Sequence, residues 1–133
     1  MGDHKTKRGA YVLWQGLPEP HDYPAAASYL ALVLPEAVAA RVVTALEAGS
    51  VTTHKAKDLL RAAGLPLLEE TNPHVAVDLT KVAHGETLSP VLLVRGDATA
   101  GRPLQIADGY HRVCASYHLD ENTDIPAVLV DLP

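Results

Sequence analysis

The segment 108–112 has the sequence Asp-Gly-Tyr-His-Arg and directly follows an apolar run that is predicted to form a strand. A helix is predicted to begin at once, over 110–118. The first turn of a helix has N–H groups without partners inside the helix, and together with the helix dipole they favour a bound anion. Gly109 allows a sharp turn and a close approach of a phosphate to the backbone. This junction is therefore the candidate ligand site.

Three side chains of the junction suit phosphate chemistry. Arg112 carries a planar guanidinium that can pair with phosphate or carboxylate oxygens. His111 can donate or accept a proton near neutral pH, and Asp108 can hold Mg²⁺ or act as a base. The backbone N–H groups of Gly109, Tyr110 and His111 are the expected phosphate donors. In the alternative interpretation, the glycine only makes a tight turn and the charged residues only stabilise the helix end.

Several further segments occur in a recognisable order between about residue 75 and the end of the chain. In chain order they are Asp78-Leu79, which is predicted to open a short helix, then 81–85, Leu88-Ser89-Pro90, 91–94, 105–112 and 125–130. This order resembles the ParB N-terminal and sulfiredoxin-like superfamily. Members of that superfamily share a helix, a glycine, a proline-led strand, a second strand, a Gly-x-x-Arg loop at a helix start, and a closing strand. The resemblance implies such a core in residues 65–133.

The branches of this superfamily differ at the loop. Sulfiredoxins carry a catalytic cysteine where this chain has Tyr110, and the only cysteine, Cys114, lies four residues further on. Sulfiredoxin activity is therefore not expected, and Cys114 is interpreted as a buried apolar residue. Partition proteins of the ParB type bind CTP through a Glu-Arg-Arg sequence, of which only Arg112 is matched.

The loop is most similar to the Asp-Gly-x-x-Arg loop of the branch that contains free-serine kinases. That resemblance implies a catalytic role for Asp108. Those kinases use a second acidic residue, for which Asp78, Glu69 and Glu70 are the candidates here. A non-catalytic regulatory or protein-interaction module, which keeps the fold without the chemistry, is the alternative.

The function predicted from these residues is binding of a nucleotide or a small phosphorylated metabolite at 108–112, with Mg²⁺-dependent phosphoryl transfer to a small molecule as the candidate reaction. The expected cofactor is Mg²⁺ together with ATP, ADP or CTP. Asp108 and His111 are the candidate catalytic residues, and Asp108 is the candidate Mg²⁺ ligand. Arg61 lies on the polar side of a preceding predicted helix, and such a side is usually a solvated charged face. In the functional alternative, Arg61 is predicted to fold over the loop as a second phosphate clamp.

The composition is that of one globular domain. The chain has 133 residues, of which 47% are hydrophobic, and a net charge of −5. No apolar run is long enough to cross a bilayer. The sequence also lacks the clusters of lysine and arginine that are typical of a surface that binds nucleic acid. The single cysteine and the polar start of the chain lead us to expect a cytoplasmic protein. A protein partner is compatible with this composition.

Helix signals dominate residues 10–64, and 1–9 are predicted to be a flexible tail. Helices are predicted from near Asp22 to Val33, from Pro35-Glu36 to Gly49, and after a Thr53 cap to Gly64. Residues 11–14, with the only tryptophan at Trp14, are expected to form a strand or an arm packed on the core.

Strands are predicted at 74–77, 91–95, 103–107 and 126–131. The expected fold is therefore α+β. It is a small mixed sheet with the N-terminal helices packed on it as a covering layer, in a single domain over 1–133.

Overall fold

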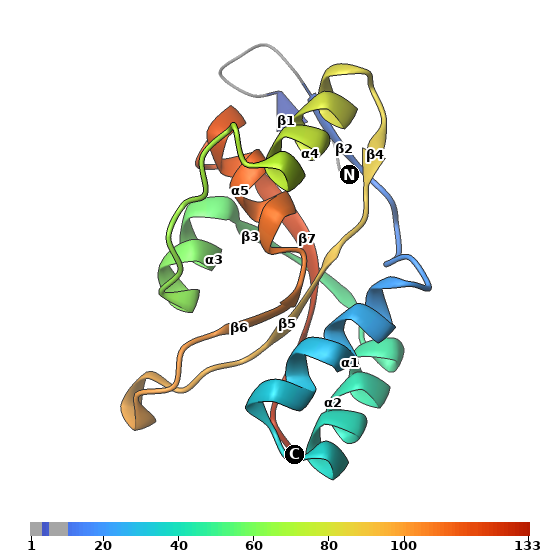
Figure 1. Cartoon of the computed structure of the whole chain (residues 1–133), viewed down its shortest axis with the longest axis vertical. Coiled ribbons are helices and arrows are strands. Elements are labelled where there is room, and N and C mark those ends of the chain that lie inside the picture. The colour runs from blue at the N-terminus through green and yellow to red at the C-terminus, as the bar shows by residue number, and fades with distance from the viewer. Residues whose placement is uncertain (1–3, 6–10) are drawn as a thin grey trace.

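A mixed four-stranded sheet runs through the middle of the molecule, as the computed structural model shows for the residues it describes, 4–5 and 11–133 (Figure 1). Its strands are β3 (Val51–Lys55), β5 (Val91–Val94), β6 (Gln105–Asp108) and β7 (Asp124–Val130). The strand order is β3-β7-β5-β6. The β7–β5 pair is parallel, whereas β3–β7 and β5–β6 are antiparallel.

In the part of the chain that the structure describes, five α-helices cover the two faces of this sheet. They are α1 (Asp22–Val33), α2 (Glu36–Ala48), α3 (Ala56–Ala63), α4 (Pro73–Ala83) and α5 (Tyr110–Leu119). In β5, Val91 and Leu93 are buried in one apolar cluster with α3, α4 and α5, whereas Leu92 and Val94 are buried in another with α1 and α2. Because successive strand residues point to opposite faces, β5 is apolar throughout.

The α+β prediction is confirmed. The predicted helices at α1, α2 and α5 end within a residue or two of the observed bounds, and α3 ends at Gly64 in the left-handed conformation. The N-terminal helices do cover the sheet, with α1 and α2 on one face and α3 on the other. The two halves of the chain share this sheet, since β3 pairs with β7.

The predicted strand at 74–77 is wrong, because these residues belong to α4. The side chain of Asn72 accepts hydrogen bonds from the backbone N–H groups of His74 and Val75, at 3.0 and 3.2 Å, and Pro73 occupies the first turn. Asparagine caps and first-turn prolines both favour a helix start. Asp78 consequently lies in the middle of α4 and does not open a helix.

The predicted cap at Thr53 is also wrong. Thr53 lies inside β3, and Lys55 precedes α3 without a capping side-chain hydrogen bond. The run Val-Thr-Thr has two β-branched residue types that favour strands. Pairing with β7 over five residues stabilises it in that form.

A second, smaller sheet contains β1 (His4–Lys5), β2 (Tyr11–Trp14) and β4 (Thr87–Leu88). The expected strand at 11–14 is therefore confirmed, and Trp14 packs against the core as predicted. Most of the predicted tail, 1–3 and 6–9, lies outside the described residues. Among the residues that are described, no helix is long and apolar enough to cross a membrane.

Candidate functional site

A cavity of about 230 Å³ opens where β6 passes into α5. Its lining comes from the junction and from one face of α4: His74, Val77, Asp78, Asp108, Gly109, His111 and Arg112. Four of the five predicted junction residues thus surround one cavity. The structure adds α4 as the opposite wall.

Gly109 allows the backbone to turn between β6 and α5. Its φ of +109° lies in a region that side-chain-bearing residues rarely adopt. A Cβ atom at this position would lie 2.4 Å from Cγ1 of Val91 and 2.9 Å from Nη2 of Arg112. The glycine therefore sets the approach of α5 to the sheet as well as the turn.

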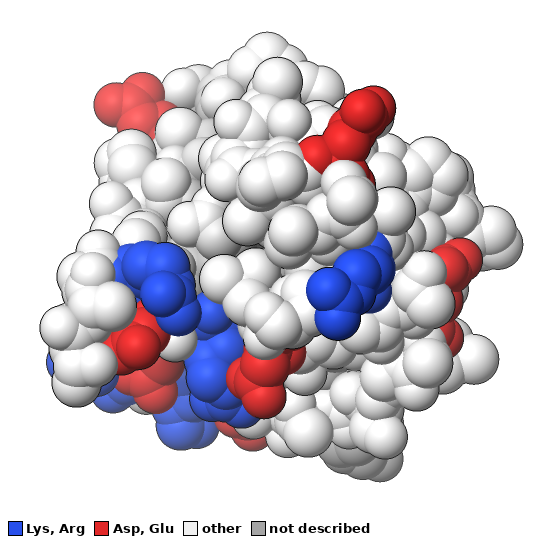
Figure 2. Space-filling view, turned by 90° about the horizontal axis from the view of Figure 1, so that it is seen from below, with Lys and Arg blue, Asp and Glu red and all other residues white. Residues whose placement is uncertain are grey.

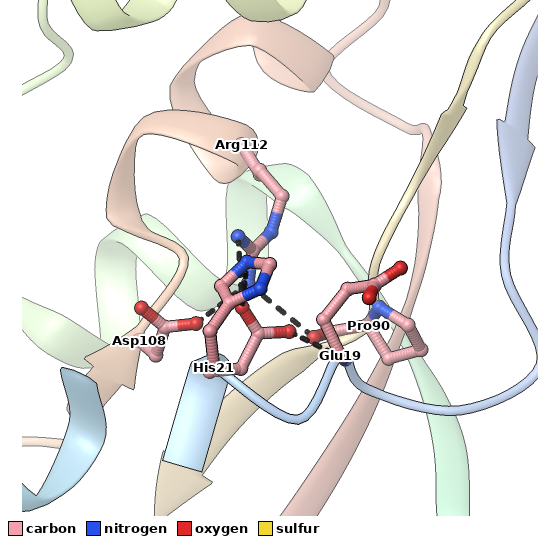
Figure 3. Close-up of polar contacts among 6 residues, drawn as sticks. Glu19, His21, Pro90, Asp108 and Arg112 are labelled. Atoms are coloured by element: carbon pink, nitrogen blue, oxygen red, sulfur yellow. Dashed lines mark hydrogen bonds and ion pairs between the residues drawn. The ribbon is translucent and has the colours of Figure 1, made fainter. Parts of the chain in front are cut away.

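The guanidinium of Arg112 is held by carboxylates, as Figure 3 shows. Nη2 donates to Oδ2 of Asp108 at 3.0 Å and to the carbonyl oxygen of Pro90 at 3.4 Å, and Nη1 lies 4.0 Å from Oδ1 of Asp22. The arginine side chain is only 16% exposed. The charge of Arg112 is therefore already balanced by carboxylates inside the protein. The sequence had predicted that this guanidinium pairs with a bound phosphate.

Asp22 is one of two residues near this site that the sequence did not predict, the other being His74. The sequence predicted Asp22 as a helix cap, but Asp22 is the first residue of α1, and His21 occupies the cap position without a side-chain hydrogen bond. Oδ2 of Asp22 instead accepts a hydrogen bond from the backbone N–H of Glu19 at 2.8 Å, and the residue is 2% exposed. No local pattern marks this role, since Arg112 lies at the other end of the chain.

Burial raises the pKa of both carboxyl groups that line the cavity. For Asp108, burial outweighs the nearby Arg112 guanidinium, which lowers the pKa, and Asp22 raises it further. For Asp78, burial again outweighs the lowering effects of Arg112 and Lys81. Each group therefore holds a proton more readily than an exposed aspartate does, a property common at functional sites.

Two histidines lie together at the cavity. The ring centroids of His74 and His111 are 4.7 Å apart, with the planes tilted by 36°. Burial and the neighbouring His74 lower the pKa of His111, and Asp78 opposes them. A neutral imidazole can accept a proton. Once α4 is recognised as a helix, the spacing of His74 and Asp78 places both on one helix face.

Tyr110 does not line the cavity. Its hydroxyl donates a hydrogen bond to the carbonyl oxygen of Pro66, so its side chain is directed to the segment before α4. Its backbone N–H still belongs to the first turn of α5. Tyr110 is thus a candidate phosphate donor through the backbone alone.

Arg61 does not fold over the loop, so that prediction is wrong. Its side chain is 85% exposed on α3 and pairs with Asp58 at 3.3 Å, lining a different cleft. Of the three acidic candidates, only Asp78 lines the cavity, whereas Glu69 and Glu70 do not. Cys114 is fully buried, and burial raises the pKa of its thiol, as expected for an apolar packing residue.

The donor set around the cavity suits a metal ion that arrives with its ligand. Carboxylate oxygens of Asp78 and Asp108 are the type that Mg²⁺ prefers, and Mg²⁺ commonly uses one or two carboxylates plus phosphate oxygens. Within residues 4–5 and 11–133, no group of three or more His, Cys, Asp or Glu side chains could hold a metal alone.

Acidic and basic side chains are mixed on the surface seen in Figure 2. On the face seen from below, bases and acids lie side by side at one corner, further charged residues are scattered over the rest, and no continuous basic surface extends across it (Figure 2). Comparison of the chain with family models, curated proteins and solved structures found no match. The ParB and sulfiredoxin-like assignment thus stays a prediction.

Proposed function

We propose that the cavity at the start of α5 binds the phosphate end of a nucleotide or a small phosphorylated metabolite together with Mg²⁺. The observation that carries this proposal is the meeting of a helix N-terminus with two largely buried carboxyl groups and two imidazoles around one cavity. These are the groups that phosphate, metal and proton transfer each require.

The size of the cavity supports a phosphate group as the part that enters. Sites that enclose a whole small molecule usually measure about 300–1,000 Å³, whereas this one measures about 230 Å³. The backbone N–H groups of Gly109, Tyr110 and His111 belong to the first turn of α5 and can donate to phosphate oxygens. The remainder of the ligand would lie outside, toward the exposed Val77.

The charges favour a magnesium complex over a free phosphate. Three carboxyl groups, from Asp22, Asp78 and Asp108, surround the single guanidinium of Arg112. A bare anion would meet this excess of negative charge. Bound Mg²⁺ would reverse it and would neutralise charge on the transferred group. Asp78 and Asp108 are the residues that would hold it.

Phosphoryl transfer from a nucleoside triphosphate to a hydroxyl is the reaction that this arrangement serves best. The acceptor oxygen would bond to the γ-phosphorus as the bond to the bridging oxygen breaks, and the nucleoside diphosphate would leave. Positioning and charge neutralisation supply most of the catalysis in such reactions. The neutral imidazole of His111 is the group we assign to take the proton of the acceptor hydroxyl. Arg112 is a positioning residue in this scheme, because it holds the Asp108 carboxylate.

Calorimetric titration tests the binding step. ATP, ADP, CTP and small phosphate monoesters are each titrated into the protein with Mg²⁺ and then with the metal chelated. We expect saturable heat only with Mg²⁺. Asp78→Asn should abolish it, whereas Asp131→Asn, an exposed aspartate paired with Arg95, should not. Equal binding without Mg²⁺ would contradict the proposal.

A non-catalytic interaction module is the second candidate. The pairing of Arg112 with two carboxylates favours it, because the loop arginine is then a structural link between α1 and α5. Val77, 55% exposed beside the cavity, offers an apolar contact for a partner. Absence of binding to any phosphorylated compound, with or without Mg²⁺, would select this candidate.

A further inference from the structure

A cleft of about 800 Å³ lies along α3, away from the site just described. Its lining includes three bases, Lys55, Lys57 and Arg61, and three leucines, Leu60, Leu65 and Leu67. It shares no lining residue with the cavity at the start of α5. Its volume is in the range of sites that bind whole small molecules, about 300–1,000 Å³.

The charge of this cleft is opposite to that of the chain. The whole sequence has 16 acidic and 11 basic residues, yet the cleft is lined by three bases and by one acid, Asp58. A local excess of positive charge on an acidic protein attracts anions to that place.

The bases of the cleft are available to a ligand. Arg61 pairs with Asp58 at 3.3 Å and Lys55 pairs with Asp124 at 3.2 Å, but all four side chains are between 44% and 85% exposed. Exposed pairs of this kind contribute little and are easily exchanged. For Lys57, the described residues provide no side-chain hydrogen bond or ion pair.

The apolar wall of the cleft is held in place by α5. The segment 65–69 has no helix or strand, but its backbone is fixed by side chains of α5. The hydroxyl of Tyr110 donates a hydrogen bond to the carbonyl oxygen of Pro66. Nε2 of His118 lies 2.7 Å from the carbonyl oxygen of Leu68. Leu65 and Leu67, each 39% exposed, are thereby presented beside the bases.

We propose that this cleft is a second binding site, for a small organic anion with an apolar or aromatic body. The anionic group, a carboxylate, sulfonate or phosphate, pairs with Lys57 and Arg61. The body lies on Leu65, Leu67 and the partly buried ring of Tyr117, which also lines the cleft. This site is independent of the function proposed for the cavity at α5.

The probe for this site is 8-anilinonaphthalene-1-sulfonate, an aromatic sulfonate whose fluorescence rises on binding. We expect saturable binding to the folded protein, with amide chemical shifts changing at 57–67 in NMR spectra. The double variant Lys57→Gln/Arg61→Gln should weaken binding by about tenfold or more, since two charge-assisted contacts are lost. Arg41→Gln, an exposed arginine on α2, is the matched control and should bind as the unaltered protein does.

Two further measurements separate charge from apolar contact. The uncharged probe N-phenyl-1-naphthylamine should bind the double variant and the unaltered protein equally. In the unaltered protein, about 1 M salt, where the Debye length is about 3 Å, should weaken binding of the sulfonate. An unchanged affinity in the double variant, no effect of salt, or shift changes centred on 108–112 would overturn the proposal.

Discussion

Arg112 forms ion pairs with two carboxylates in the candidate site. Its replacement should therefore lower the stability of the folded protein. Arg112→Ala leaves the carboxylates of Asp22 and Asp108 without their cation, and breaking a buried pair typically costs about 3–5 kcal/mol. We expect the free energy of unfolding near neutral pH to fall by about 3 kcal/mol in urea titrations.

Arg95→Ala is the matched control for this change. Arg95 pairs with Asp131 at 2.6 Å, but both side chains are more than 60% exposed. Its loss should cost less than about 1 kcal/mol. Equal effects of the two substitutions would show that the Arg112 cluster is no stronger than a surface pair.

Asp78 is expected to lower stability when it is ionised. Its folded-state pKa is raised by burial, so the folded protein favours the protonated form, and stability is lost as pH rises through that pKa. Asp78→Asn removes this loss. Thermal unfolding should therefore show the variant more stable near neutral pH, by up to about 1 kcal/mol. The gain should vanish below the ordinary pKa of 3.8.

Asp97→Asn should change stability in the opposite direction. The hydroxyl of Thr99 and backbone N–H groups lower the pKa of Asp97, so its carboxylate stabilises the fold above its ordinary pKa. This variant should be less stable than the unaltered protein near neutral pH. A stability loss in Asp78→Asn at that pH would mean that the buried carboxylate is held by contacts stronger than its burial cost.

At the scale of elements, the turn between β6 and α5 depends on Gly109. Gly109→Ala forces a side chain into a positive φ and places Cβ 2.4 Å from Val91. The expected loss in the free energy of unfolding is about 2 kcal/mol or more. Gly85 has a positive φ of +73° with nothing within 4 Å, so Gly85→Ala should cost about 1 kcal/mol. Similar losses at both positions in urea titrations would show that the contact with Val91 relaxes freely.

Elements with repeated apolar spacing and clear ends could be predicted from the sequence. The bounds of α1 and α2 follow from Pro35 between them and Gly49 after them. The four residues 74–77 alternate like a strand, and this pattern is too short to outweigh a helix cap at Asn72. The strand β3 was missed because its partner, β7, lies in the last part of the chain.

The candidate site was predictable where it is local. Asp108, Gly109, His111 and Arg112 are neighbours in sequence, and the strand and helix around them place them at one cavity. Asp22 and His74 reach the same region from distant segments, and only tertiary packing determines that. Arg61 was misplaced for the same reason, since helix α3 presents it to another cleft.

At the scale of the whole molecule, the two apolar clusters share strands β5 and β7, so neither layer of helices has a core of its own. We therefore expect unfolding to occur in one cooperative transition. Fluorescence of Trp14, which packs on the α3–α5 side, and circular dichroism, which reports all helices, should give coincident urea curves. Separate midpoints would show that α1 and α2 unfold independently of the rest.

The sheet also joins parts of the chain that lie before and after the segment 65–72. Five residue pairs link β3 to β7. Backbone hydrogen bonds of 3.0 Å run from the N–H of Ala56 to the carbonyl oxygen of Thr123 and from the N–H of Leu104 to that of Ala62. A chain divided between residues 69 and 72 would thus yield two fragments, each with an incomplete sheet and an exposed apolar face. Produced together, such fragments should associate and rebuild the native fold. The loop between residues 69 and 72 is therefore where we expect the protein to tolerate a break in its chain.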